Sequence, residues 1–92
     1  MKKKKILLAE ANPLVLKHLE SSLVNTEYEI TSTIDGADVI KHLQAEDPDL
    51  IVMDLILPKF DGWQILKLLK SLKNDNIPVL IISGQNLNKK ER

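Results

Sequence analysis

The sequence has no cysteine, a single tryptophan, tyrosine and phenylalanine, and no excess of either charge. Without cysteine, disulfide frameworks and thiolate metal sites are excluded. Thirteen basic residues balance thirteen acidic ones, so there is no general electrostatic attraction to nucleic acid, and there are few rings to stack on bases. The one basic run, residues 2–5, is interpreted as a solvated leader to the first strand rather than a nuclear-localisation or membrane-surface patch.

Long apolar runs are also lacking. No stretch approaches the roughly 18 to 20 apolar residues that a membrane span needs, and residues 6–9 are too short for the core of a signal peptide. We therefore expect no membrane segment and a cytoplasmic location. The length of 92 residues predicts a single domain over residues 1–92, large enough to bury about 60 to 65% of the surface of the unfolded chain.

Four short segments have the pattern of β-strands and alternate with segments of helical spacing. The predicted strands are ILLA at 6–9, YEITST at 28–33, LIVM at 50–53 and VLII at 79–82. Apolar residues three or four positions apart predict a helix in each gap, at Val15, Leu19 and Leu23, at Ala37, Ile40 and Leu43, and at Ile65, Leu68, Leu69 and Leu72. This alternation predicts an α/β fold with a parallel sheet.

The strand compositions also predict the order of the sheet. Three strands are apolar throughout, as expected where both faces are covered, whereas 28–33 alternates and suits an edge. These features favour the strand order 2-1-3-4. Right-handed crossovers then place the first helix on one face and the next two on the other. Asn12 before Pro13, and Asp35 before Gly36, are predicted to open helices.

Two carboxylates follow the central strands of this predicted sheet. Glu10 comes directly after the first strand and Asp54 directly after the third, 44 residues later. In an open parallel sheet, ligands bind beyond the carboxyl ends of the strands, where the strand order reverses. With order 2-1-3-4 that point lies between the first and third strands, so Glu10 and Asp54 are predicted to face one crevice.

Three separated motifs carry a resemblance to a known family. KILLAEANPLVL, PDLIVMDLILPKFDGWQIL and IPVLIISG occur in the same order as in the receiver domains of two-component response regulators. The sequence resembles that family over essentially its whole length. The resemblance implies a flavodoxin-like open parallel sheet of order 2-1-3-4, so this order is not independent of the resemblance. It also implies a phosphorylation-accepting signalling domain rather than an enzyme, with at most slow self-dephosphorylation.

The resemblance assigns roles to individual positions. It implies that Asp54 is the phosphate acceptor, and that Mg²⁺ is held by Glu10, Asp54 and the backbone carbonyl of Ile56. Ser83 would hydrogen-bond the phosphoryl oxygens, and Gly84 would leave room for them. Lys59 lies outside this active set, and Pro58 and Gly62 shape the loop. The implied partner is a histidine kinase or phosphotransfer protein.

The sequence departs from the family pattern after the first strand. The family usually carries two adjacent acids there, and the second normally touches the metal. Here the pair reads Glu10 and Ala11. Because a methyl group ligates nothing, we expect weak Mg²⁺ binding and slow phosphorylation.

A second departure is expected at the carboxyl end. The family continues with a fifth strand, which bears a lysine that pairs with the phosphoryl group, and a fifth helix. The 92 residues do not include these elements, so a truncated receiver fold is expected. The fourth strand would then be an exposed apolar edge, which is a template for pairing with another chain. We expect self-association through that edge.

Two functions remain open. The first is a receiver-type signalling domain that accepts a phosphoryl group on Asp54 with weakened Mg²⁺-dependent chemistry. The alternative is a phosphorylation-independent pseudo-receiver that acts in interaction or dimerisation. An aspartyl-phosphate hydrolase is disfavoured, because Ile56 stands where such enzymes carry their second acid. His18 and His42 lie on different predicted helices, with no further ligand beside either.

Overall fold

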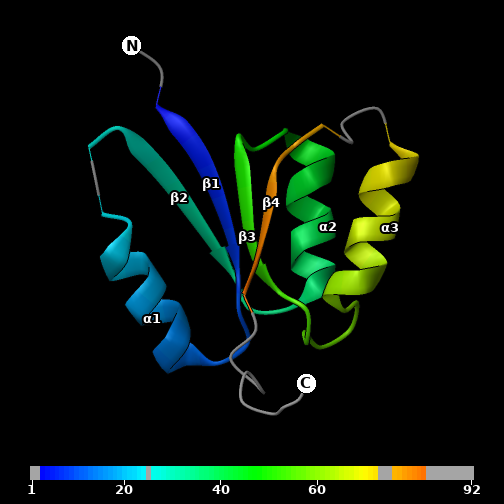
Figure 1. Cartoon of the computed structure of the whole chain (residues 1–92), viewed down its shortest axis with the longest axis horizontal. Helices are drawn as coiled ribbons and strands as arrows, with labels where there is room; N and C mark the ends of the chain where they lie inside the picture. Colours follow the sequence, from blue (N-terminus) through cyan, green and yellow to red (C-terminus); the bar gives the residue numbers. More distant parts are fainter. Residues whose placement is uncertain (1–2, 25, 73–75, 83–92) are drawn as a thin grey trace.

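The protein is a three-layer α/β domain. The structure is a computed structural model, and it describes residues 3–24, 26–72 and 76–82. Figure 1 shows a parallel sheet with one helix on one side and two on the other. The elements in chain order are β1 (Lys4–Ala9), α1 (Pro13–Ser22), β2 (Tyr28–Thr33), α2 (Gly36–Ala45), β3 (Leu50–Asp54), α3 (Gly62–Ser71) and β4 (Val79–Ile82).

The sheet order β2-β1-β3-β4 is the predicted one. All three pairings are parallel, and β1 lies between β2 and β3. Two strand boundaries differ from the sequence prediction: β1 begins at Lys4 rather than at residue 6, and β3 ends at Asp54 rather than at residue 53. Lys4 and Lys5 pair with Tyr28 and Glu29 of β2 through their backbones, a contribution that a hydrophobic pattern does not register.

The two faces of the sheet bury different amounts of apolar surface. On the α2 and α3 face, nine buried residues form one cluster: Leu7, Ala9, Val39, Leu43, Ile51, Met53, Leu57, Ile65 and Leu69. On the α1 face only Ile6, Leu8 and Val52 are buried, and partly buried leucines of α1 pack against them. Helix α1 itself has no fully buried residue. The predicted distribution of helices is therefore confirmed, but the two layers are unequal.

Each helix begins at a polar cap that the sequence indicates. The Asn12 side chain accepts hydrogen bonds from the N–H groups of Leu14 and Val15. The Asp35 carboxylate accepts from the N–H of Asp38, and Asp61 forms a reciprocal capping box with Gln64 at α3. These caps satisfy N–H groups that have no partner within the helix.

In the part of the chain that the structure describes, no helix has the length and apolar character that a bilayer crossing demands. One lysine of the basic run at the amino end, Lys5, contacts two acidic side chains. Its Nζ lies 2.8 Å from Glu46 Oε1, and its backbone N–H donates to Asp49 Oδ2.

The smaller cluster makes a testable contribution to stability. Leu8 is 0% exposed in the central strand, whereas Leu14 on α1 is 79% exposed. We expect Leu8→Ala to lower the free energy of unfolding by about 2 to 5 kcal/mol, because it leaves a cavity between β1 and α1. Leu14→Ala, the matched control, should change it by less than about 0.5 kcal/mol. Urea unfolding of both variants measures this, and equal losses would contradict the assignment of Leu8 to the core.

Candidate functional site

The carboxyl ends of β1 and β3 bring Glu10 and Asp54 together. Ala9 pairs with Met53 in the sheet register, so the next residue of each strand lies at the same level. Glu10 is 5% exposed and Asp54 is 8% exposed, and they are the only carboxylates among the buried residues that the structure describes. The predicted juxtaposition of two acids 44 residues apart is thus present in the structure.

Backbone groups hold both carboxylates in place. The N–H of Asn12 donates to Glu10 Oε2 at 3.0 Å, and the N–H of Ile56 donates to Asp54 Oδ1 at 3.1 Å. Each acid therefore accepts a hydrogen bond from the residue two positions later. These bonds restrict the rotation of the two side chains at the carboxyl ends of β1 and β3.

Burial raises the pKa of Glu10 above its ordinary value. Loss of solvation is the main cause, and the charge of Asp54 together with a hydrogen bond between the two carboxyl groups adds to it. The Asn12 N–H acts in the opposite direction. Carboxyl groups placed this close together and shielded from water oppose the ionised form of Glu10, and a cation bound beside them would offset their charge.

The donor set suits a hard cation such as Mg²⁺. Both side chains supply oxygen, which Mg²⁺ prefers, and this ion is commonly held by one or two carboxylates with water in its remaining positions. In the described residues no third histidine, cysteine, aspartate or glutamate completes a cluster. Ala11, where the family usually has an acid, supplies no ligand. The residues fit the ion with a reduced set of protein ligands.

A neighbouring buried hydroxyl was not anticipated from the sequence. Thr33, at the end of β2, is almost fully buried, and its Oγ1 donates to the carbonyl of Leu8 at 2.9 Å. Its carbonyl accepts the N–H of Glu10 at 3.1 Å. Thr33 therefore fixes the end of β1 from which Glu10 projects. A threonine in an alternating edge strand carries no local signal of this role.

The loop after β3, residues 55–61, is the other wall of the site, and we call it the acceptor loop. It follows Asp54, the last residue of β3, includes Ile56, and ends at Asp61, the N-cap of α3. The Gly62 N–H closes it by donating to the carbonyl of Leu55 at 2.8 Å. A side chain at Gly62 would bring its Cβ within 2.7 Å of Leu55 Cα, so glycine is required for this closure.

Two predicted site residues, Ser83 and Gly84, fall outside the described residues. His18 is exposed on α1, and His42 lies on α2 with its Nδ1 2.9 Å from the carbonyl of Asp38. Neither histidine forms a metal-binding cluster with Glu10 and Asp54 among the described residues.

Comparison with known proteins points to one family. The response regulator receiver domain family matches residues 6–91. The alkaline phosphatase synthesis transcriptional regulatory protein PhoP of Bacillus subtilis is 32% identical over 83 residues, which are 90% of this chain and 34% of PhoP. The chain spans about a third of the length of the curated relatives it matches.

Solved structures show the same architecture. The phosphorylated cyanobacterial phytochrome response regulator RcpA is 34% identical, with a TM-score of 0.81 over 88% of this chain and 65% of RcpA. The receiver domain of sensor histidine kinase PA1611 from Pseudomonas aeruginosa PAO1, with magnesium in its active-site cleft, is 26% identical. Its TM-score is 0.83, with coverage of 94% of this chain and 71% of that one.

The raised pKa of Glu10 predicts a pH-dependent penalty on stability. Below about pH 4 the carboxyl group is protonated in both folded and unfolded chains, so no penalty arises. As the pH rises, the unfolded chain releases this proton more readily, and stability falls through the folded pKa. Glu10→Gln removes the ionisable group and keeps an oxygen for the Asn12 N–H.

We therefore expect Glu10→Gln to be more stable than the parent near neutral pH in metal-free buffer, and equal to it near pH 4. Urea unfolding at both pH values measures the difference. Glu29→Gln, at an exposed position on β2, is the control and should show little change at either pH. A Glu10→Gln protein no more stable than the parent at neutral pH would contradict the penalty.

Proposed function

The chain belongs to the response regulator receiver domain family, and we propose that it accepts a phosphoryl group on the carboxylate of Asp54. The observation that carries this proposal is the closeness of the two buried carboxyl groups of Asp54 and Glu10 at the carboxyl ends of the two central strands. Ligands bind at this position in open parallel sheets. Receiver domains serve in signalling, and the described geometry supports that role for this chain.

The proposed reaction is a displacement at phosphorus. An oxygen of Asp54 forms a bond to phosphorus while the bond from phosphorus to the donor breaks, and the donor leaves with that electron pair. The Ile56 N–H on Oδ1 orients the attacking carboxylate. Mg²⁺, when bound, would offset the negative charges of the acceptor and the phosphoryl group. Glu10, Asp54 and the Ile56 carbonyl are the residues that would hold it.

Other proposed features follow from the family pattern. Ser83 would donate its hydroxyl hydrogen to a phosphoryl oxygen, which gains charge on transfer. Phosphoryl loss would be a slow hydrolysis of the acyl phosphate. A histidine kinase or phosphotransfer protein would supply the phosphoryl group in the cytoplasm. The relatives named as transcriptional regulators are longer than this chain, so an output domain is not part of the proposal.

Ala11 favours a second candidate function. No third histidine, cysteine, aspartate or glutamate of the described residues is grouped with Glu10 and Asp54, so the site has fewer ligands than the family pattern provides. Weak Mg²⁺ binding would slow phosphorylation, and the fold would then serve as a phosphorylation-independent interaction or dimerisation module. The two candidates share one structure and differ in whether Asp54 reacts.

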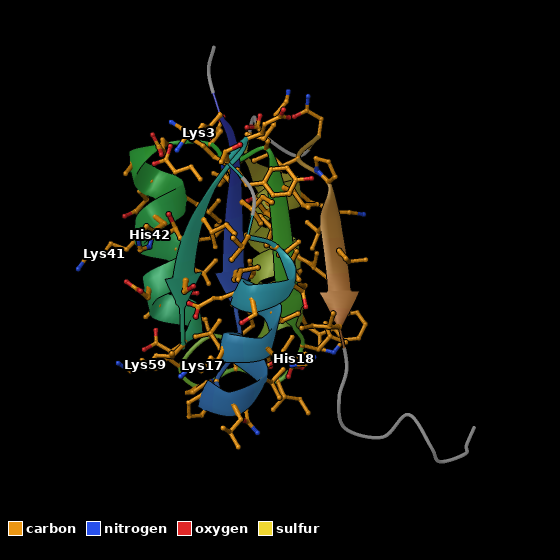
Figure 2. The ribbon with its side chains drawn as sticks, turned by 90° about the vertical axis from the view of Figure 1, so that its left-hand side faces the viewer. Lys3, Lys17, His18, Lys41, His42 and Lys59 are labelled. Carbon is orange, nitrogen blue, oxygen red and sulfur yellow. The ribbon has the colours of Figure 1, made fainter. Side chains whose placement is uncertain are left out.

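The proposed dimerisation surface is the edge of the sheet at β4. Among the described residues β4 pairs with β3 alone, and Figure 2 shows it at the right-hand margin of the sheet. Leu80 is 55% exposed in this strand. Unpaired backbone groups beside an exposed apolar side chain suit pairing with a second copy of the chain.

Phosphorylation can be tested directly. The chain is incubated with a small phosphodonor and Mg²⁺, and its intact mass is measured over time. We expect a slow gain of one phosphoryl group that is absent in Asp54→Asn. No gain in the parent at any time would favour the phosphorylation-independent module. A gain that persists in Asp54→Asn would place the acceptor elsewhere.

The missing acid can be restored as a companion to that measurement. We expect Ala11→Asp to raise Mg²⁺ affinity by about tenfold or more, since it adds a carboxylate to the donor set, and to speed the mass gain. Ala11→Asn, of similar size but without the charge, is the matched control. Equal Mg²⁺ affinities for the parent and Ala11→Asp would show that the missing carboxylate at position 11 is not what limits Mg²⁺ binding.

Self-association through β4 predicts that the molar mass of the particles in solution rises with protein concentration. We expect light scattering to report dimers of the parent at high concentration and monomers of Leu80→Lys, because a charge opposes burial of that edge. Val24→Lys changes a residue that is 77% exposed beyond α1 and should leave the dimers intact. A monomeric parent at high concentration would remove this surface from the proposal.

A further inference from the structure

The acceptor loop is attached to α2 as well as to the two elements that it joins in sequence. The N–H of Gly36, the first residue of α2, donates to the carbonyl of Pro58 at 3.0 Å. The ammonium of Lys59 lies 3.5 Å from Oδ2 of Asp35, the N-cap of α2. The loop that bears Ile56 is therefore held by a segment more than twenty residues away in sequence.

Gly36 permits an approach that no other residue allows. A Cβ built at Gly36 would lie 1.6 Å from the carbonyl oxygen of Phe60 and 2.5 Å from its carbonyl carbon. Both obstructing atoms belong to the backbone, so they cannot move aside as a flexible side chain would. Any side chain at Gly36 must displace the acceptor loop, the first turn of α2, or both.

Lys59 adopts an unusual backbone conformation between the two contacts. Its φ is 72°, and it is the only non-glycine residue with positive φ in the part of the chain that the structure describes. The left-handed region is disfavoured for a side chain with a Cβ. The turn at Lys59 directs the carbonyls of Pro58 and Phe60 toward Gly36. In Figure 2 Lys59 lies at the end of α2 nearest the strand arrowheads.

The Asp35 carboxylate links the cap of α2 to this turn. Its pKa is lowered first by the Asp38 N–H and then by the Lys59 ammonium. Lys59 is mostly exposed, and an exposed ion pair of this kind adds little stability. The backbone geometry therefore holds the loop more firmly than the ion pair does.

We infer that the first turn of α2 positions the phosphoacceptor site, with Gly36 and the left-handed Lys59 as positioning residues. They act on the backbone between Pro58 and Phe60. That backbone continues, two residues before Pro58, into Ile56, whose N–H orients the Asp54 carboxylate. Leu57, buried in the larger cluster, anchors the segment between them. The inference rests on the proposed function only where Mg²⁺ binding is the readout.

The test uses pairs of variants that differ in one property. Lys59→Gly and Lys59→Val both remove the ammonium, but only valine opposes the left-handed conformation. Gly36→Ala introduces the obstructed Cβ. Leu43→Ala weakens the packing of α2 about two turns further along the helix, and it controls for a general loss of stability. All variants are made in the full 92-residue chain.

Two measurements are made on each protein. The first is the amide hydrogen-exchange rate and chemical shift of Ile56 by NMR without metal, which reports its bond to Asp54. The second is the Mg²⁺ dissociation constant by titration calorimetry. We expect faster Ile56 exchange in Lys59→Val and Gly36→Ala than in Lys59→Gly and Leu43→Ala. Mg²⁺ affinity in Lys59→Val should be about tenfold weaker than in Lys59→Gly.

The outcomes separate the inference from the proposed function. If Ile56 behaves alike in Lys59→Val and Lys59→Gly, positioning by α2 is overturned, whatever the affinity for Mg²⁺. An unchanged Mg²⁺ affinity in Lys59→Val overturns it too, provided that the parent binds the ion. In a third outcome, the parent binds no Mg²⁺ but Ile56 amide exchange is still faster in Lys59→Val than in Lys59→Gly. That result supports the inference and counts against the proposed chemistry.

Discussion

Two buried carboxyl groups close together are the constraint around which this domain is organised. Holding Glu10 and Asp54 close together costs free energy, because the two groups lose hydration and repel each other. Both effects raise the Glu10 pKa. The central strands supply the rigidity that this needs, since Leu8, Ala9 and Met53 directly before the acids are fully buried. The loops beyond the strands add N–H groups aimed at each acid. Without a cation or a proton to offset these charges, this arrangement of carboxyl groups is unfavourable.

The fold and the central pair could be predicted because each depends on local patterns. Short stretches of sequence are enough to indicate the continuous apolar strands, the alternating edge strand and the polar helix caps. Once the strand order is fixed, the placement of Glu10 beside Asp54 follows from the parallel register. The family resemblance supplied roles for these residues and flagged Ala11, which no periodicity could have done.

The contacts of the acceptor loop could not be predicted, because they depend on how closely distant backbones approach. Asp35 and Gly36 have the sequence of a helix start, and that prediction is right. Nothing in the pair indicates that the Phe60 carbonyl would occupy the space beside Gly36. Lys59 likewise resembles an ordinary loop lysine, and its positive φ appears only in three dimensions. Tertiary proximity, rather than residue type, decides both.

The central position of β1 has a consequence for synthesis on the ribosome. β1 precedes its two partners in the chain, and Ile6 pairs with Leu50, which is made 44 residues later. At about 5 to 20 residues per second, this strand waits roughly two to nine seconds before its second edge is covered. Its four buried residues are preceded by Lys4 and Lys5. Charges flanking an apolar strand oppose aggregation, so we expect Lys4 and Lys5 to reduce aggregation of the nascent chain during that interval.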